Sequence, residues 1–225
     1  MLRSLSEIYN YSIEAVDGEI GKVQDFLFDD NTAHIRYMVV RTGSWLLGKM
    51  VLLPPAVMGK PDWASETFSV KLTQDQVKNS PDINADLPVS REMESRLYAY
   101  YGWPSYWSFP PMREQHLRST REVKNYRIHA RDGRIGRIDD FIVDDEAWRI
   151  RYLVVETHEW LPGKKVIISP AWVKHIDWLQ REAVVNHSRK EIENAPEYDP
   201  SAPVNRRYEE QVYDYYGRPK YWSKT

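Results

Sequence analysis

Five carboxylates recur at a fixed spacing of 115 residues, and their type and placement could support acid–base chemistry. The pairs are Glu7/Glu122, Asp17/Asp132, Asp25/Asp140, Asp29/Asp144 and Asp30/Asp145. Catalysis by such groups needs a positioned partner, such as a histidine, a lysine or a second convergent acid. The spacing places none of the six histidines opposite another, and the chain has no cysteine. The sequence therefore predicts no catalytic residue, no metal site and no cofactor.

Asp25 and Asp140 are the two carboxylates whose presence in both copies is not explained by a role in a turn. Strand alternation would put Asp25 on the same face as Val23, and this face is expected to point inward. A buried carboxylate needs a hydrogen-bond donor or a cation, and Arg36 and Arg151 stand at matching places in the two copies. We interpret Asp25 with Arg36, and Asp140 with Arg151, as structural ion pairs or buried hydrogen bonds rather than general acids or bases.

The spacing of 115 reflects a duplication of a whole domain. Residues 2–108 align with residues 117–223 without an insertion, and 46 of the 107 pairs are identical. A repeat of this length fits an autonomous domain and is much longer than a solenoid unit. The predicted organisation is a first repeat at 1–108, a linker at 109–115 and a second repeat at 116–225.

Within each repeat, apolar residues alternate with period two, which is typical of short strands. Asp17-Gly18 and Asp132-Gly133 favour tight hairpins, and short aspartate side chains at 29–30 and 144–145 favour turns that bond the local backbone. Five or six short strands in about 70 residues predict a mainly β fold, with a small, closed or nearly closed antiparallel barrel in each repeat.

Each barrel is expected to be followed by two short helices and an aromatic tail. Thr73 and Ser188 begin capping boxes, and Ser90 and Asn205 can cap the second helices. Gly102 and Gly217 fit the C-terminal ends of these helices.

Aromatic residues give the strongest indication of function, since Tyr and Trp are enriched at the energetic centres of interfaces. The tails either fold back to cover a barrel or form a docking surface, and a Trp-Leu pair in one loop of each repeat is a second place for contact. The predicted interaction surface consists of Trp45, Leu46, Tyr101, Trp103, Tyr106, Trp107, Trp160, Leu161, Tyr216, Tyr221 and Trp222.

Charge and hydropathy narrow the class of protein. The net charge is −2, and the longest apolar runs are far shorter than a membrane span. The first residues lack the pattern of a secretion signal, so the expected location is the cytoplasm. Eight basic residues between Arg113 and Arg137 form a stripe that either contacts phosphates or docks on the acidic first repeat.

The combined pattern resembles the PRC-barrel family. The resemblance rests on residues 17–29, 35–40 and 51–54, and it recurs at 132–144, 150–155 and 166–170. It implies a small β-barrel like those of the reaction-centre H subunit and of a ribosome maturation factor, where the barrel serves assembly and contact. This sequence lacks the membrane helix of the former and the separate N-terminal barrel of the latter.

We therefore expect a non-enzymatic binding or assembly module that contacts a protein partner or itself. One alternative is an RNA-binding accessory factor in ribosome or RNA maturation, which would use the stripe from Arg113 to Arg137. A second alternative is a small-ligand or enzymatic site at the domain junction.

Overall fold

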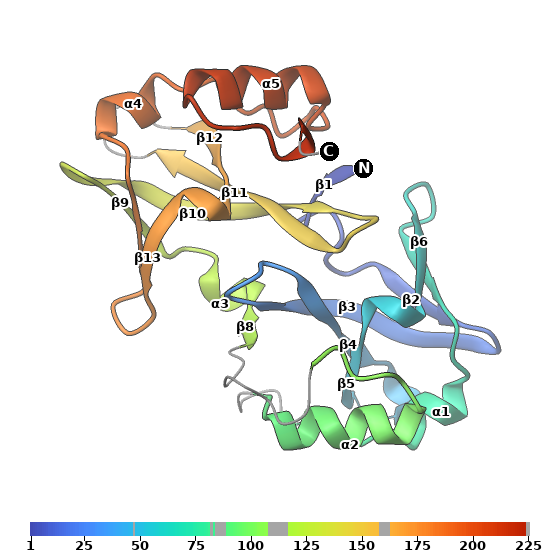
Figure 1. The fold of residues 1–225 in the computed structure, drawn as a ribbon. Coiled ribbons are helices and arrows are strands. Elements are labelled where there is room, and N and C mark those ends of the chain that lie inside the picture. The colour runs from blue at the N-terminus through green and yellow to red at the C-terminus, as the bar shows by residue number, and fades with distance from the viewer. Residues whose placement is uncertain (47, 82, 84–88, 108–116, 158–162, 224–225) are drawn as a thin grey trace. The chain divides into compact units, whose positions relative to one another are not determined.

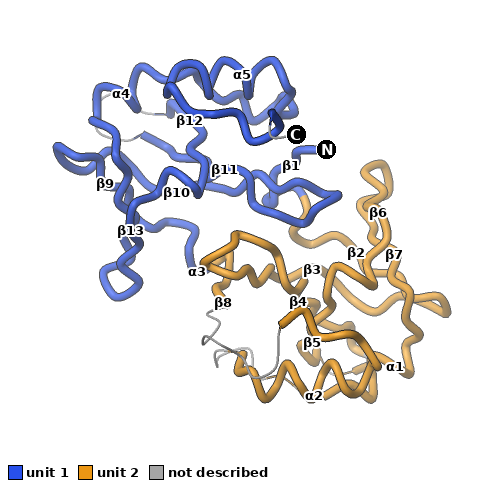
Figure 2. Tube along the Cα trace, in the orientation of Figure 1, with its two compact units in different colours: residues 1–7, 122–225 blue, residues 8–121 orange. Residues whose placement is uncertain are grey.

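The computed structural model describes the whole chain except residues 47, 82, 84–88, 108–116, 158–162 and 224–225. It contains two compact units, coloured separately in Figure 2. Unit 1 comprises residues 1–7 and 122–225, and unit 2 comprises residues 8–121. These units differ from the repeats predicted from the sequence, because residues 1–7 of the first repeat belong to unit 1. The predicted linker, 109–115, lies outside the described residues.

Unit 2 contains a seven-stranded sheet with the order β5-β4-β3-β2-β7-β6, and β8 pairs with β3 beside this path. The strands are β2 (Ser12–Ala15), β3 (Gly18–Asp29), β4 (Ile35–Thr42), β5 (Met50–Leu53), β6 (Met58–Asp62), β7 (Thr67–Val70) and β8 (Leu117–Ser119). Two 3-10 turns connect strands that follow each other in the chain: Ser44–Leu46 lies between β4 and β5, and Pro55–Val57 lies between β5 and β6.

Unit 1 repeats this arrangement with the order β12-β11-β10-β9-β14-β13, and β1 pairs with β10 beside the path. The strands are β1 (Leu2–Ser4), β9 (Arg127–Ala130), β10 (Gly133–Asp144), β11 (Arg149–Thr157), β12 (Lys164–Ile168), β13 (Val173–Asp177) and β14 (Glu182–Val185). A 3-10 turn at Pro170–Trp172 lies between β12 and β13.

The prediction of mainly β structure is confirmed, but the closed antiparallel barrel is not. In the described part of each unit, the paired strands form an open path. This path ends at β5 and β6 in unit 2, and at β12 and β13 in unit 1. These edge strands are consecutive in the chain and are joined by proline-containing 3-10 turns. Proline has no amide hydrogen to extend a strand ladder. The sheets are also mixed, since β2 pairs parallel to β7 and β9 parallel to β14.

The long strands β3 and β10 each form a hairpin and then a bulge. The predicted Asp-Gly hairpins are confirmed, with antiparallel pairing on both sides of the turn. Farther along, the register shifts between Val23 and Asp25, and between Ile138 and Asp140. An extra residue at these points moves the following side chains to the opposite face. Asp25 therefore does not share a face with Val23, as simple alternation predicts.

Two pairs of helices follow the sheets, and their predicted caps are confirmed. The capping boxes at Thr73 and Ser188 begin α1 (Gln74–Lys78) and α4 (Arg189–Glu193). Ser90 and Asn205 accept backbone hydrogen bonds at the starts of α2 (Arg91–Tyr101) and α5 (Arg206–Tyr215). One helical turn, α3 (Thr120–Val123), and one 3-10 turn, Tyr221–Ser223, complete the described helical elements.

The tail helix of unit 2 covers the face of the sheet that alternation would leave to solvent. Tyr37 and Val39 of β4 form a buried cluster with Leu97 and Tyr98 of α2. Their neighbour Met38 points to the opposite face and is also buried. Figure 1 shows α2 beside β5, and α5 in the corresponding place in unit 1. Both faces of these central strands are thus covered.

Candidate functional site

Each sheet is completed by the first strand of the other repeat. Arm 1, residues 1–7, contributes β1, which pairs antiparallel with β10, so that Ser4 lies opposite Ile142. Arm 2, residues 117–121, contributes β8, which pairs with β3, so that Ser119 lies opposite Leu27. Residues 1–7 appear in the colour of unit 1 in Figure 2. The two repeats therefore exchange equivalent strands.

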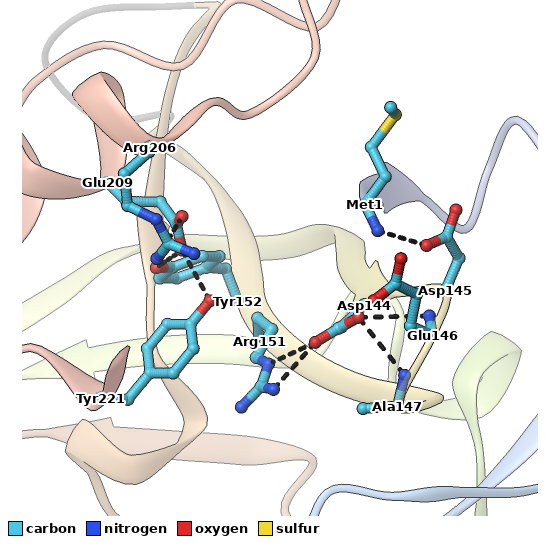
Figure 3. A network of polar contacts seen from close by, with 10 residues as sticks. All are labelled: Met1, Asp144, Asp145, Glu146, Ala147, Arg151, Tyr152, Arg206, Glu209 and Tyr221. Atoms are coloured by element: carbon cyan, nitrogen blue, oxygen red, sulfur yellow. Dashed lines mark hydrogen bonds and ion pairs between the residues drawn. The ribbon is translucent and has the colours of Figure 1, made fainter. Parts of the chain in front are cut away.

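The receptor for arm 1 is the segment 140–145, which contains the end of β10 and the turn after it. Asp140 accepts hydrogen bonds from the Ser4 hydroxyl and from the Ser6 amide at 3.2 Å. Leu5 donates its amide to the Phe141 carbonyl at 2.9 Å, and its side chain is fully buried. At the end of the arm, the Met1 amino group pairs with Asp145 (Figure 3).

The receptor for arm 2 is the equivalent segment 25–30. Asp25 accepts hydrogen bonds from the Ser119 hydroxyl, the Thr120 hydroxyl at 2.8 Å and the Arg121 amide at 3.2 Å. Asp30 forms an ion pair with Arg118 at 3.3 Å. The two receptors thus use the same two carboxylate positions to hold their arms. This duty explains why both aspartates are retained in the duplicated sequence.

The predicted arginine partners of these carboxylates are wrong. Arg36 pairs with Asp29 at 3.1 Å, and Arg151 pairs with Asp144 at 2.8 Å. The bulge is the reason, because it turns Asp25 and Asp140 toward the arms. The prediction that these carboxylates form structural hydrogen bonds agrees with their contacts. Donors from the arms therefore occupy the oxygens of both carboxylates.

Asp29 and Asp144 organise the turns that end the two receptors. One oxygen of Asp29 accepts the amides of Asn31 and Thr32, and one oxygen of Asp144 accepts those of Glu146 and Ala147. Burial acts to raise the pKa of both carboxyls, but the arginine and backbone hydrogen bonds outweigh it, so each pKa lies below its usual value. Both groups are therefore held as carboxylates.

A buried glutamate joins each tail to its own sheet. Glu209 of α5 accepts hydrogen bonds from the hydroxyls of Tyr152 at 2.6 Å and Tyr221 at 3.0 Å, and it pairs with Arg206 at 2.9 Å (Figure 3). Arg151 lies 4.4 Å from the centre of the Tyr221 ring. The network therefore continues through Arg151 and Asp144 to the turn that receives arm 1.

Unit 2 contains the same network. Glu94 accepts from Tyr37 and Tyr106 and pairs with Arg91 at 2.8 Å. Burial, followed by the nearby Glu94 charge, raises the pKa of both tyrosines, so they stay protonated and donate. Sequence reasoning missed this network. Its signal is the retention of Glu, Arg and Tyr at equivalent places, with the glutamate on the buried face of a helix.

Most of the predicted interaction surface packs within its own unit. Tyr101, Trp103, Tyr106 and Trp107 lie against the cluster around Tyr37 and Tyr98. In unit 1, Tyr213 contacts Tyr221 and Trp222, with ring centres 6.1 and 5.0 Å apart, and Tyr216 contacts Trp172. The tails thus cover their own sheets, which was one of the two predicted arrangements. Leu46 is half-buried, and Trp160, Leu161 and the side chain of Trp45 lie outside the described residues.

The predicted basic stripe is largely paired with carboxylates. Arg127, Arg131 and Arg137 lie 2.9 Å from Glu182, Glu191 and Glu156, respectively. Arg134 also reaches Glu182, and Arg121 lies over the Tyr9 ring. Arg113 is outside the described residues. This pairing leaves less positive charge available to phosphates than the sequence alone indicates.

The comparisons with known proteins fit this duplicated arrangement. Residues 2–73 and 118–190 both match the PRC-barrel domain. The chain belongs to the PRC-barrel family. An uncharacterized protein of Deinococcus radiodurans is 40% identical over 79 residues, which are 35% of this chain and 28% of the relative. The chain therefore matches less than a third of the length of that relative.

The PRC-barrel match shows which parts are exchanged and which are additional. Each matched stretch begins within an arm, so the first strand of each PRC-barrel domain completes the sheet of the other one. The matches end before α2 and α5, so the aromatic tails lie beyond the matched PRC-barrel regions.

A small pocket borders arm 1 within unit 1. It measures about 130 Å³ and is lined by the polar residues Arg3, Ser4, Glu7, Tyr198 and Ser201 together with neighbouring apolar groups. Burial raises the pKa of Glu7, although Arg3 opposes this effect, and burial raises the pKa of Tyr198 to about 12. In the described part of the PRC-barrel chain, no group of three His, Asp or Glu side chains could hold a metal ion, and no helix is long and apolar enough to cross a bilayer.

Proposed function

We propose that this PRC-barrel protein is a non-enzymatic assembly module that binds protein segments by strand addition. The reciprocal exchange of arms supports this proposal, since each sheet already accepts a strand from a separate domain. Main-chain hydrogen bonds supply affinity in this mode, and side-chain pockets supply specificity. The receptor at 140–145 provides both, through the β10 ladder and the site that buries Leu5.

The contacts also argue against the two alternatives. RNA phosphates would have to compete with glutamates for most described arginines of the stripe, because Arg127, Arg131, Arg134 and Arg137 each pair with one. A catalytic carboxylate would need an open oxygen beside a substrate, whereas Asp140 is 8% exposed and accepts three hydrogen bonds.

The test combines sedimentation velocity of the intact chain with affinity capture from its native cells at low and high salt. If the chain assembles through protein contacts, it should associate with itself or capture another protein, and this association should persist at high salt. Capture of RNA that disappears at high salt would contradict the proposal, because phosphate contacts weaken steeply with salt. A chain that stays monomeric and captures no protein would also contradict it.

A further inference from the structure

We propose that the partner in this assembly is a second copy of the chain, and that arm 1 of one copy docks in the 140–145 receptor of the other. This inference rests on the assembly function proposed above and names its partner and its contact. The contact is the one that the structure already contains between β1 and β10.

The first argument is that arms and receptors are interchangeable parts. Both arms contain the same tripeptide, Leu2-Arg3-Ser4 and Leu117-Arg118-Ser119. Both receptors contain Asp-Phe at their start and Asp-Asp at their end, at residues 25–30 and 140–145. The serine hydroxyl reaches the first aspartate in both units. A second copy therefore carries a strand with every group that the receptor recognises.

The second argument concerns how arm 1 is attached. Arm 1 is followed directly by unit 2, which begins at Ile8, so the connection between arm 1 and unit 2 runs through Glu7 and Ile8. β1 lies beside the sheet path and is not part of it, so release of arm 1 leaves the order β12-β11-β10-β9-β14-β13 intact. Its strand pairs three residues with β10, and one further backbone bond on each side, at Met1 and at Leu5, extends the ladder, so release breaks a short ladder.

The third argument is energetic. Docking within one chain and docking between two chains make the same contacts, so these contacts cancel in the equilibrium between the two forms. The remaining difference is the effective concentration of the arm and any strain in its connection. Raising the protein concentration must therefore favour exchange between copies.

The test uses two single-cysteine variants, which is possible because the chain contains no cysteine. Ser4→Cys is placed in one copy and Ile142→Cys in another, since these residues face each other across the arm contact. Opposite residues on antiparallel strands have Cβ atoms about 5 Å apart, close to the range that disulfides bridge. The variants are mixed over a range of concentrations, oxidised mildly and separated without reductant.

Exchange predicts a mixed covalent dimer whose share increases with protein concentration and decreases when a peptide of residues 1–7 is added. Ser4→Cys mixed with Leu179→Cys provides the background from random collision, because Leu179 is 94% exposed. A dimer yield at this background would overturn the inference. If either variant loses its native circular dichroism, Leu2→Cys with Asp144→Cys repeats the test at a neighbouring register pair.

Two failures can be told apart. If the unmodified chain associates in sedimentation but both cysteine pairs stay at background, exchange is refuted and the assembly function survives. If the unmodified chain neither associates nor captures a protein, the assembly function fails as well.

Discussion

The two units hold their arms with carboxylates at the same two positions, but they fill one buried position differently. In unit 1 the position is Leu5, and in unit 2 it is Thr120, whose hydroxyl bonds to Asp25 and to Tyr9. Both side chains are fully buried. The comparison teaches that the carboxylate and the backbone ladder define strand recognition, whereas the buried position admits either an apolar or a hydrogen-bonded side chain.

A second difference lies under the tails. Unit 1 has a buried His187 beside Tyr216 and Trp172, where unit 2 has Leu72, Tyr101 and Val57. The His187 Nε2 atom and the Tyr216 hydroxyl are buried and have no hydrogen-bond partner within the described residues. The second repeat thus carries a titratable group in a place where the first repeat has an apolar core.

The largest expected effect is at the shared glutamates, and it should be equal in both units. Glu209→Ala or Glu94→Ala leaves two tyrosine hydroxyls and an arginine without their acceptor, so each should reduce the free energy of unfolding by about 3–5 kcal/mol. Guanidinium unfolding followed by tryptophan fluorescence measures the loss. Glu210→Ala and Glu92→Ala are the controls, since these helix neighbours are exposed and should change stability by less than about 0.5 kcal/mol. A loss in one unit only would show that the two networks are not equivalent.

The next effect separates the arms. Leu5→Ala removes a fully buried side chain and should destabilise unit 1 by about 2–4 kcal/mol. Thr120→Ala removes hydrogen bonds but little volume, and should destabilise unit 2 by about 1–2 kcal/mol. Chemical denaturation of the two variants gives this difference directly. If Thr120→Ala reduced the free energy of unfolding more than Leu5→Ala does, the description of the Leu5 contact as apolar and of the Thr120 contact as hydrogen-bonded would be wrong.

A smaller effect is expected in both units at the carboxylates that bind the arms. Asp140→Asn and Asp25→Asn keep the size of the side chain but replace one acceptor oxygen with an amide, at a cost of about 1–2 kcal/mol each. Hydrogen exchange should show faster exchange of the Ser6 amide in the first variant and of the Arg121 amide in the second. Unchanged protection of these amides would mean that the carboxylates do not hold the arms.

The smallest effect is a pH dependence confined to unit 1. Burial lowers the pKa of His187 in the folded protein. The positive charges of Arg218 and Arg131 also lower this pKa, whereas the negative charge of Glu191 raises it. As the pH falls, His187 therefore binds a proton in the unfolded chain at a higher pH than in the folded protein. Unit 1 should lose stability as the pH falls from about 6.5, the pKa of an unfolded histidine, toward the lower pKa of His187 in the folded protein. Urea unfolding between neutral and mildly acidic pH tests this, and His187→Leu should remove the dependence. A dependence that persists in that variant would assign it to another group.

Local features could be predicted from the sequence because their causes are local. The Asp-Gly hairpins and the capping boxes at Thr73 and Ser188 depend on residues a few positions apart. The partners of Asp25 and Asp140 could not be predicted, since one bulge residue reverses the face on which each lies. The exchange of arms left no local signal, because Leu-Arg-Ser stands at the start of both repeats and would fit either sheet.

The central claim is that each sheet is completed by the arm of the other repeat, and a pair of double-cysteine variants tests it most directly. Ser4→Cys/Ile142→Cys joins arm 1 to β10, whereas Ser4→Cys/Leu27→Cys would join it to the equivalent place on β3 of its own repeat. The products are digested and mapped by mass spectrometry at low protein concentration. The structure predicts a disulfide within one chain for the first variant and none for the second, and the opposite result would contradict the exchange.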